Sequence, residues 1–185
     1  MNKMTNLSKL STIVLFIGIL FASCNDCSKC TNELPTAESL QIEAANKQLA
    51  DNLEMYTSVW DNIINKGDLE LINETNFDKN ITLVYSPEDI VGIDAFKDHY
   101  NNYIVGFSDV SFTIVDVFGQ GDKIVKHWSF KGTHSGDFFG IPATGNEIDI
   151  DGVTLVKMID GKIAQEQDFM DNLEFMQQLG MIPRE

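Results

Sequence analysis

The hydrophobic residues of this chain change their spacing halfway along the sequence. Before about residue 107 they recur every three or four positions, which is the period of a helix with one buried face. After it come four segments with the alternation or β-branched content of strands: 110–118, 123–134, 147–159 and 162–170. Helices followed by consecutive antiparallel hairpins are typical of an α+β domain whose helices pack on one face of a curved sheet.

The expected elements around these strands are helices over 37–66, 68–74, 92–107 and 171–180 and a strand over 80–86. Gly67 ends the first helix, and Gly180 ends the last. A sheet rolled around helices leaves a cone, and its open end is a natural pocket for a small molecule.

The N-terminus is predicted to be an export signal with a lipid attachment site. Two lysines precede the apolar run "TIVLFIGILFA", whose eleven residues are too few to span a bilayer, which needs about 20. Small residues directly before Cys24 resemble the lipobox of bacterial lipoproteins. We therefore expect a signal peptide over 1–23, a lipidated tether over 24–36 and one domain over 37–185, held at a membrane of the cell envelope. An uncleaved anchor or an ordinary secretory signal is the alternative.

The charge of the chain excludes nucleic acid as an expected partner. The formal net charge is −15, and loss of residues 1–23 with Lys3 and Lys9 makes it 11 − 28 = −17. Nucleic-acid binding needs a basic face that neutralises phosphates. The other two cysteines, Cys27 and Cys30, fall in the expected tether without a fourth cysteine for a metal, so the folded domain has none of its own.

Three segments give the chain a family resemblance. They are "GTHSGDFFGIPATG" (132–145), "DGKIAQEQDFMDNLEFMQQLG" (160–180) and, upstream, "VWDNIINKGDLE" (59–70). Together they resemble the SnoaL-like polyketide cyclases, or ester cyclases, of the nuclear-transport-factor-2-like superfamily. The resemblance implies an α+β cone, no metal or organic cofactor, and often a homodimer. For the characterised cyclases it also implies an aspartate that acts as acid and base in an intramolecular aldol ring closure.

Two aspartates are candidates for that role. Asp171 precedes the last helix with Glu174 three residues later, which is the arrangement of a helix cap. Asp168 lies within the last strand, where it has no capping role, and the family motif places the acid/base group there. The alternative for Asp168 is an outward-facing surface position, since Glu166 shares its face of the strand.

This sequence differs from the family pattern at two positions that are expected near Asp168. Thr154 stands where the characterised cyclases have an assisting histidine, and Gln167 stands where a tryptophan is common. A threonine can donate a hydrogen bond but cannot titrate near neutral pH. These two residues therefore predict a pocket of this family that lacks the assisting histidine.

The remaining candidates are expected to line the pocket: Tyr56, Trp60, Trp128, His134 and Phe138. The aromatic residues have the alternative of plain core packing, and His134 that of hydrogen bonding to the following turn. Glycines of 132–145 are expected to shape the bend between two long strands. His99 and His127 are isolated from other metal ligands, and "DIDG" lacks the glutamate of a calcium loop, so no metal site is predicted.

These observations leave three functions open. The first is a cofactor-independent enzyme with cyclase or isomerase-type acid/base chemistry on a small apolar carbonyl compound, with Asp168 as the base. The second is a binding module that holds a small apolar ligand without reacting it. The third is a dimeric assembly domain that uses the open face of the sheet.

Overall fold

The computed structural model describes residues 36–184. The predicted signal peptide, Cys24 and all of the predicted tether except Thr36 lie outside the described residues. Within 36–184, no helix is both long enough and apolar enough to cross a membrane.

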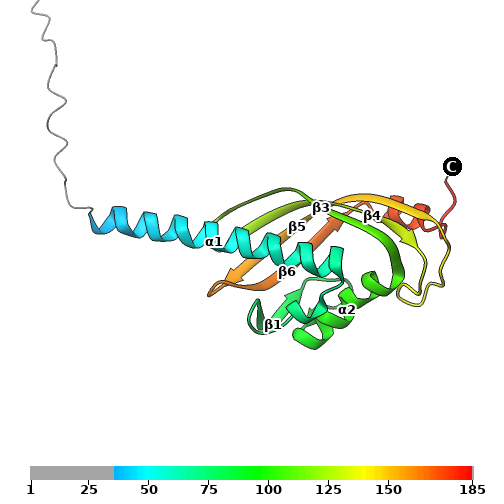
Figure 1. Ribbon diagram of the computed structural model, residues 1–185, viewed down its shortest axis with the longest axis horizontal. Coiled ribbons are helices and arrows are strands. Elements are labelled where there is room, and N and C mark those ends of the chain that lie inside the picture. Colours follow the sequence, from blue (N-terminus) through cyan, green and yellow to red (C-terminus); the bar gives the residue numbers. More distant parts are fainter. Residues whose placement is uncertain (1–35, 185) are drawn as a thin grey trace, which may run out of the picture. The chain divides into compact units, whose positions relative to one another are not determined.

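Six strands form one curved, unclosed sheet in the order β2-β1-β6-β5-β4-β3 (Figure 1). Their bounds are β1 Phe77–Leu83, β2 Ile90–Val91, β3 Phe107–Gln120, β4 Lys123–His134, β5 Glu147–Ile159 and β6 Lys162–Met170. The α+β expectation is confirmed. One detail differs, because β1 pairs with β6 in parallel whereas every other pair is antiparallel. After β1 the chain forms β2 and then the helix α2 before it enters β3, so no hairpin joins β1 to β6.

The helix α1 (Ala37–Lys66) lies along one face of the sheet (Figure 1). Thr36 caps its start by accepting a hydrogen bond from the Ser39 amide at 3.1 Å. Gly67 ends it with a φ of 68°, a left-handed conformation that suits glycine. Only its second half carries buried residues, so this half is the part of α1 that packs on the domain. A single 3-10 turn, η1 (Leu69–Leu71), follows where the sequence predicts a short helix.

The helix α2 (Ile93–Gly106) packs beside α1 through aromatic rings. The ring centroid of Tyr100 lies 4.6 Å from that of Trp60 and 4.8 Å from that of Phe96. Burial of such a side chain stabilises the fold by about 1.5–3 kcal/mol. The aromatic cluster therefore holds both helices over the same part of the sheet.

The glycine-rich segment between β4 and β5 folds back onto α2. The amides of Ser135 and Gly136 both donate to the carbonyl oxygen of Gly106. A Cβ atom at residue 136 would lie 2.0 Å from the carbonyl oxygen of Val105, so only glycine allows this approach. The segment thereby brings Phe138 against the core and leaves its neighbour Phe139 exposed.

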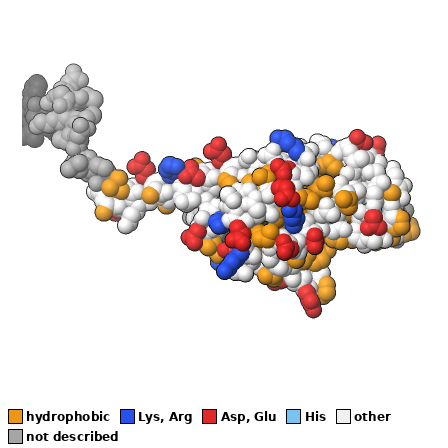
Figure 2. Space-filling view, turned by 60° about the horizontal axis from the view of Figure 1, so that its bottom comes forward, with side chains coloured by type: hydrophobic (Ala, Val, Ile, Leu, Met, Phe, Trp, Pro, Cys, Tyr) orange, Lys and Arg blue, Asp and Glu red, His pale blue; other side chains and the backbone are white. Residues whose placement is uncertain are grey.

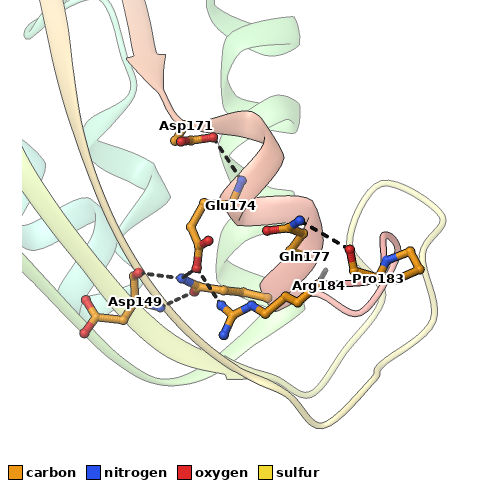
Figure 3. A network of polar contacts seen from close by, with 7 residues as sticks. Asp149, Asp171, Glu174, Gln177, Pro183 and Arg184 are labelled. Carbon is orange, nitrogen blue, oxygen red and sulfur yellow. Dashed lines mark hydrogen bonds and ion pairs between the residues drawn. The ribbon is translucent and has the colours of Figure 1, made fainter.

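The helix α3 (Asn172–Gln178) closes the domain (Figure 3). Asp171 accepts a hydrogen bond from the Glu174 amide at 2.9 Å, which confirms the predicted cap. The Glu174 carboxylate does not reach back to the cap; it accepts from Gln178 and Arg184 instead. Gln178 in turn bonds the backbone of Asp149, and this network ties α3 to β5.

The outer face of the sheet, away from α1, carries exposed apolar side chains. Phe118, Val125 and Leu155 are paired in one row across β3, β4 and β5, and Val153 and Phe169 are paired in the next. Phe118, Leu155 and Phe169 are about half exposed. On the face that Figure 2 displays, acidic side chains are scattered among apolar ones, with few Lys and Arg.

Candidate functional site

The candidate site lies on the inner face of the sheet, under α1 and α2. Backbone pairing places Lys126 of β4, Thr154 of β5 and Asp168 of β6 side by side in one row. Glu166 precedes Asp168 by two residues and therefore points to the same face. One ammonium and two carboxyl groups are thus brought together inside the cone.

Asp168 is held by two hydroxyl groups. Its Oδ1 accepts a hydrogen bond from Thr154 Oγ1 at 2.5 Å, and its Oδ2 accepts one from Tyr100 Oη at 3.2 Å. Thr154 in turn accepts from Trp128 Nε1 at 3.0 Å, which orients the threonine hydroxyl toward Asp168. Thr154 is fully buried, whereas Asp168 is exposed, so the carboxylate is both fixed in position and accessible.

Glu166 is the buried acid of the site. Its Oε1 accepts hydrogen bonds from Tyr56 Oη at 2.6 Å and from Trp60 Nε1 at 3.0 Å. The pKa of the Glu166 carboxyl is raised from 4.5 to about 7, mainly by burial and to a lesser degree by the charge of Asp168, while Lys126 and the hydrogen bonds from Tyr56 and Trp60 oppose the rise. Near neutral pH this carboxyl therefore exists in both protonation states.

Tyr100 connects the two acids. Its hydroxyl lies 3.4 Å from Glu166 Oε2 and 3.2 Å from Asp168 Oδ2. Burial, followed by the charges of Asp168 and Glu166, raises the pKa of Tyr100 well above its usual value, so the hydroxyl keeps its proton. A single proton serves one carboxylate at a time. When Glu166 is protonated, the Tyr100 proton is available to Asp168.

Lys126 is a buried amine surrounded by aromatic rings. Its Nζ lies 4.5 Å from the ring centroid of Trp60, 5.3 Å from that of Tyr56 and 5.4 Å from that of Phe112. Rings at these distances stabilise an ammonium group. Burial lowers the pKa of Lys126, and the charges of Glu166 and Asp168 partly offset that effect.

Two hollows meet at Asp168. An inner cavity of about 60 Å³ lies between α1, α2 and the sheet; its lining includes Trp60, Lys126 and Trp128. An outer groove of about 620 Å³ runs between α2, the glycine-rich segment and α3. Tyr103, Asp168 and Met170 line both. A molecule in the groove would therefore contact the same carboxylate as a group that reaches into the cavity.

The outer groove has aromatic walls. His99 and Phe139, whose ring centroids lie 5.1 Å apart, line the groove together with Phe138. Burial lowers the pKa of His99 to about 4, against the opposing charge of Asp168. At neutral pH His99 is therefore an uncharged part of the wall.

The structure groups most of the residues singled out from the sequence. Trp60 and Trp128 line the inner cavity and Phe138 lines the outer groove. Tyr56 and Thr154 reach the site through hydrogen bonds to Glu166 and Asp168.

His134 lies apart from this group. It is fully buried and lines neither hollow, and its Nδ1 lies 3.0 Å from Thr144 Oγ1. It therefore contacts the turn that follows β4, which is the alternative interpretation of this residue.

Sequence reasoning missed Lys126, Glu166 and Tyr100. A signal for Lys126 was present, because it interrupts the apolar alternation of Ile124, Trp128 and Phe130 along β4. A lysine in such a series points into the core unless the strand changes register. Among residues 36–184, no three His, Cys, Asp or Glu side chains cluster as a metal site.

Comparisons with known proteins agree with the fold. Residues 50–179 match the sequence model of the SnoaL-like polyketide cyclases. A 49-residue segment is 39% identical to aklanonic acid methyl ester cyclase DnrD of Streptomyces peucetius, covering 26% of this chain and about a third (34%) of that relative.

Solved structures give the same result over most of the domain. A SnoaL-like polyketide cyclase from Jannaschia sp. has a TM-score of 0.63 at 20% identity, covering 72% of this chain and 94% of its own. TsrD of Streptomyces laurentii has a TM-score of 0.62 at 25% identity, covering 74% of this chain and 97% of its own. The Jannaschia likeness extends to the fold alone.

The raised pKa of Glu166 predicts a pH-dependent stability. Between pH 4.5 and 7 the Glu166 carboxyl is largely protonated in the folded chain and largely ionised in the unfolded chain. The stability that this proton contributes is therefore lost as pH rises through that window. Urea unfolding should show that the wild type loses about 2–3 kcal/mol more than Glu166→Gln between about pH 5 and about pH 8.

His99 acts in the opposite direction over the lower part of this range, because its pKa is lowered to about 4. His99 contributes equally to the wild type and to Glu166→Gln. Subtracting the unfolding free energies of the two proteins at each pH therefore removes its contribution. Equal pH dependence in the wild type and Glu166→Gln would contradict a raised pKa at Glu166.

Proposed function

Because the chain belongs to the SnoaL-like polyketide cyclase family, we propose that it is an acid/base enzyme that acts on a small, largely apolar carbonyl compound through Asp168. The observation that carries this proposal is the position of the Asp168 carboxylate. It lies on the wall shared by the inner cavity and the outer groove, and two neutral hydroxyl donors fix its orientation.

The outer groove suits the body of such a ligand. Small-molecule sites commonly enclose 300–1,000 Å³ with mostly apolar walls and a few polar groups, a range that includes the groove's volume of about 620 Å³. Its aromatic walls supply apolar contact at little cost in side-chain freedom. Asp168 supplies the polar group at the inner end.

In the proposed reaction, Asp168 removes a proton from the carbon beside a carbonyl group. The electron pair of the broken C–H bond forms a carbon–carbon bond to a second carbonyl of the same molecule, and the resulting alkoxide takes the proton back from Asp168. In an isomerase-type reaction the proton returns to another carbon. Thr154 positions the carboxylate in place of the histidine found in characterised cyclases, so Asp168 is the only group assigned to proton transfer.

The same pocket without proton transfer is the second candidate function. It is favoured by Thr154, which cannot titrate near neutral pH and leaves Asp168 without a histidine partner. A binding module of this kind would hold an apolar ligand and release it unchanged. The two functions differ in one measurable property: the enzyme exchanges protons beside the carbonyl of a bound ketone with solvent, and the binding module does not.

We predict that the wild type speeds deuterium exchange at the carbon beside the carbonyl of β-tetralone, a small apolar ketone. Asp168→Asn should lower this enzymic rate about 100- to 10,000-fold, because a positioned base contributes that much. Proton NMR in deuterated buffer measures the rate. Asp171→Asn is the matched control, since asparagine also caps helices well. Undiminished exchange by Asp168→Asn would contradict the proposal, and wild-type binding without exchange would favour the binding module.

We also propose that the chain is exported and anchored to a membrane of the cell envelope by a lipid on Cys24. The support is the sequence alone: a short apolar run after two lysines, with small residues before the cysteine. The tether would then keep an acidic domain close to the membrane, where apolar molecules concentrate.

Metabolic labelling with palmitate in a bacterial host tests the anchor. The wild type should carry the label and sediment with membranes, and Cys24→Ala should lose the label because the attachment atom is gone. Cys27→Ala and Cys30→Ala are controls that should keep it. If the Cys24→Ala protein still carried the label, the lipid would be attached to another residue, and the proposed anchor at Cys24 would be wrong.

A homodimer stays a prediction. The outer sheet face offers a surface for it, because exposed apolar side chains that lie together favour contact with a second apolar surface. If two copies paired through this face, the inner cavity of each would remain uncovered, because it lies on the opposite side of the sheet.

A further inference from the structure

Lys126 is a buried cationic group that the proposed reaction leaves without a role. Lys126 is 3% exposed and is one of the residues that line the inner cavity. No residue between 36 and 184 accepts a hydrogen bond from it or lies within ion-pair distance. A buried ammonium has three donor positions to fill. Lys126 is therefore ready to bind an acceptor atom that enters the cavity.

The size of the cavity restricts what that acceptor can be. A dry cavity of about 150 Å³ holds a benzene molecule, so one of about 60 Å³ takes only the end of a ligand. The body of that ligand must lie in the outer groove, past Tyr103 and Met170, where the two hollows meet. A ligand placed in this way has Asp168 beside it and Lys126 beyond its tip.

We propose that Lys126 binds the carbonyl oxygen of the ligand and stabilises the negative charge that forms there when Asp168 removes the neighbouring proton. The formation of this charge rests on the proposed function of Asp168. The proton moves from carbon to the carboxylate, the electron pair of the C–H bond moves toward oxygen, and the ammonium keeps its own protons. The ligands of this site are therefore enolisable ketones and diketones rather than hydrocarbons.

The surroundings of Lys126 favour this electrostatic role over covalent attachment. An imine would need an uncharged amine that attacks the carbonyl carbon and expels water. Three aromatic rings within 5.4 Å of Nζ stabilise the charged form. Glu166 and Asp168 supply negative charge that offsets part of the cost of burying an ammonium.

Dimedone is a suitable probe because this apolar cyclic diketone is already an enolate at neutral pH, so its binding needs no proton removal. Isothermal titration calorimetry of the purified full-length protein should give an affinity that Lys126→Met lowers about 10- to 100-fold, since a hydrogen bond to a charged group contributes that much. Lys123→Met is the control, because this lysine is exposed on the same strand.

Neutral β-tetralone tests whether Lys126→Met still has an intact pocket. Loss of dimedone binding with β-tetralone binding kept supports the proposal. Loss of both ligands, or of neither, overturns it. A gain in protein mass equal to dimedone minus water, located at Lys126 by peptide mapping, also overturns it in favour of covalent attachment.

The same measurements separate this inference from the proposed function. Asp168→Asn should bind the dimedone enolate at least as tightly as the wild type, because a like charge is removed from beside it. If Lys126→Met loses dimedone while Asp168→Asn still exchanges β-tetralone protons, the anion site stands and the base is wrong. If Asp168→Asn loses exchange while Lys126→Met binds dimedone normally, the base stands and the anion site is wrong.

Discussion

The site depends on one set of hydrogen bonds, those that Tyr56 and Trp60 of α1 donate to the buried carboxyl of Glu166 on β6. They join the helical layer to the sheet close to Asp168 and Lys126. Without these donors, the Glu166 carboxyl would lie in an apolar interior with little to satisfy it, which is costly. These two donors and the positive charge of Lys126 stabilise the ionised form of Glu166 and oppose the effect of burial on its pKa.

This balance of charges has a functional consequence at Asp168. Glu166 takes the buried position, so Asp168 can stay accessible while Thr154 and Tyr100 hold its oxygens. The two acids differ through their surroundings, although they lie two residues apart on one strand. The division leaves one carboxylate open to a ligand and one carboxyl group as part of the core.

The sequence predicted the fold well because the signals were local. The second half of α1 has a buried stripe at helical spacing, Gly67 ends it, and each long strand has its own run of apolar residues. The parallel pairing of β1 with β6 was not predictable in this way, since it joins segments far apart in the chain. The Asp171 cap was predictable from two residues, whereas the carboxylate of Glu174 found partners on α3 and at Arg184 instead.

The site was predicted less completely for a physical reason. Both faces of β6 carry polar residues, with Gln165 and Gln167 on one and Glu166 and Asp168 on the other, so period two alone could not identify the inner face. Tyr100 joins the two acids only because α2 docks over β6. Lys126 was detectable as an interruption in an apolar alternation, and its meaning depended on the aromatic rings that α1 and β3 bring to it.

The most direct test of this account is a crystal structure of the protein with dimedone bound. The account predicts one ring oxygen in the inner cavity within hydrogen-bond distance of Lys126 Nζ, the carbon between the two carbonyls against Asp168, and the methyl groups in the outer groove. A ring bound elsewhere, or one whose oxygens point away from Lys126 into the groove, would contradict it.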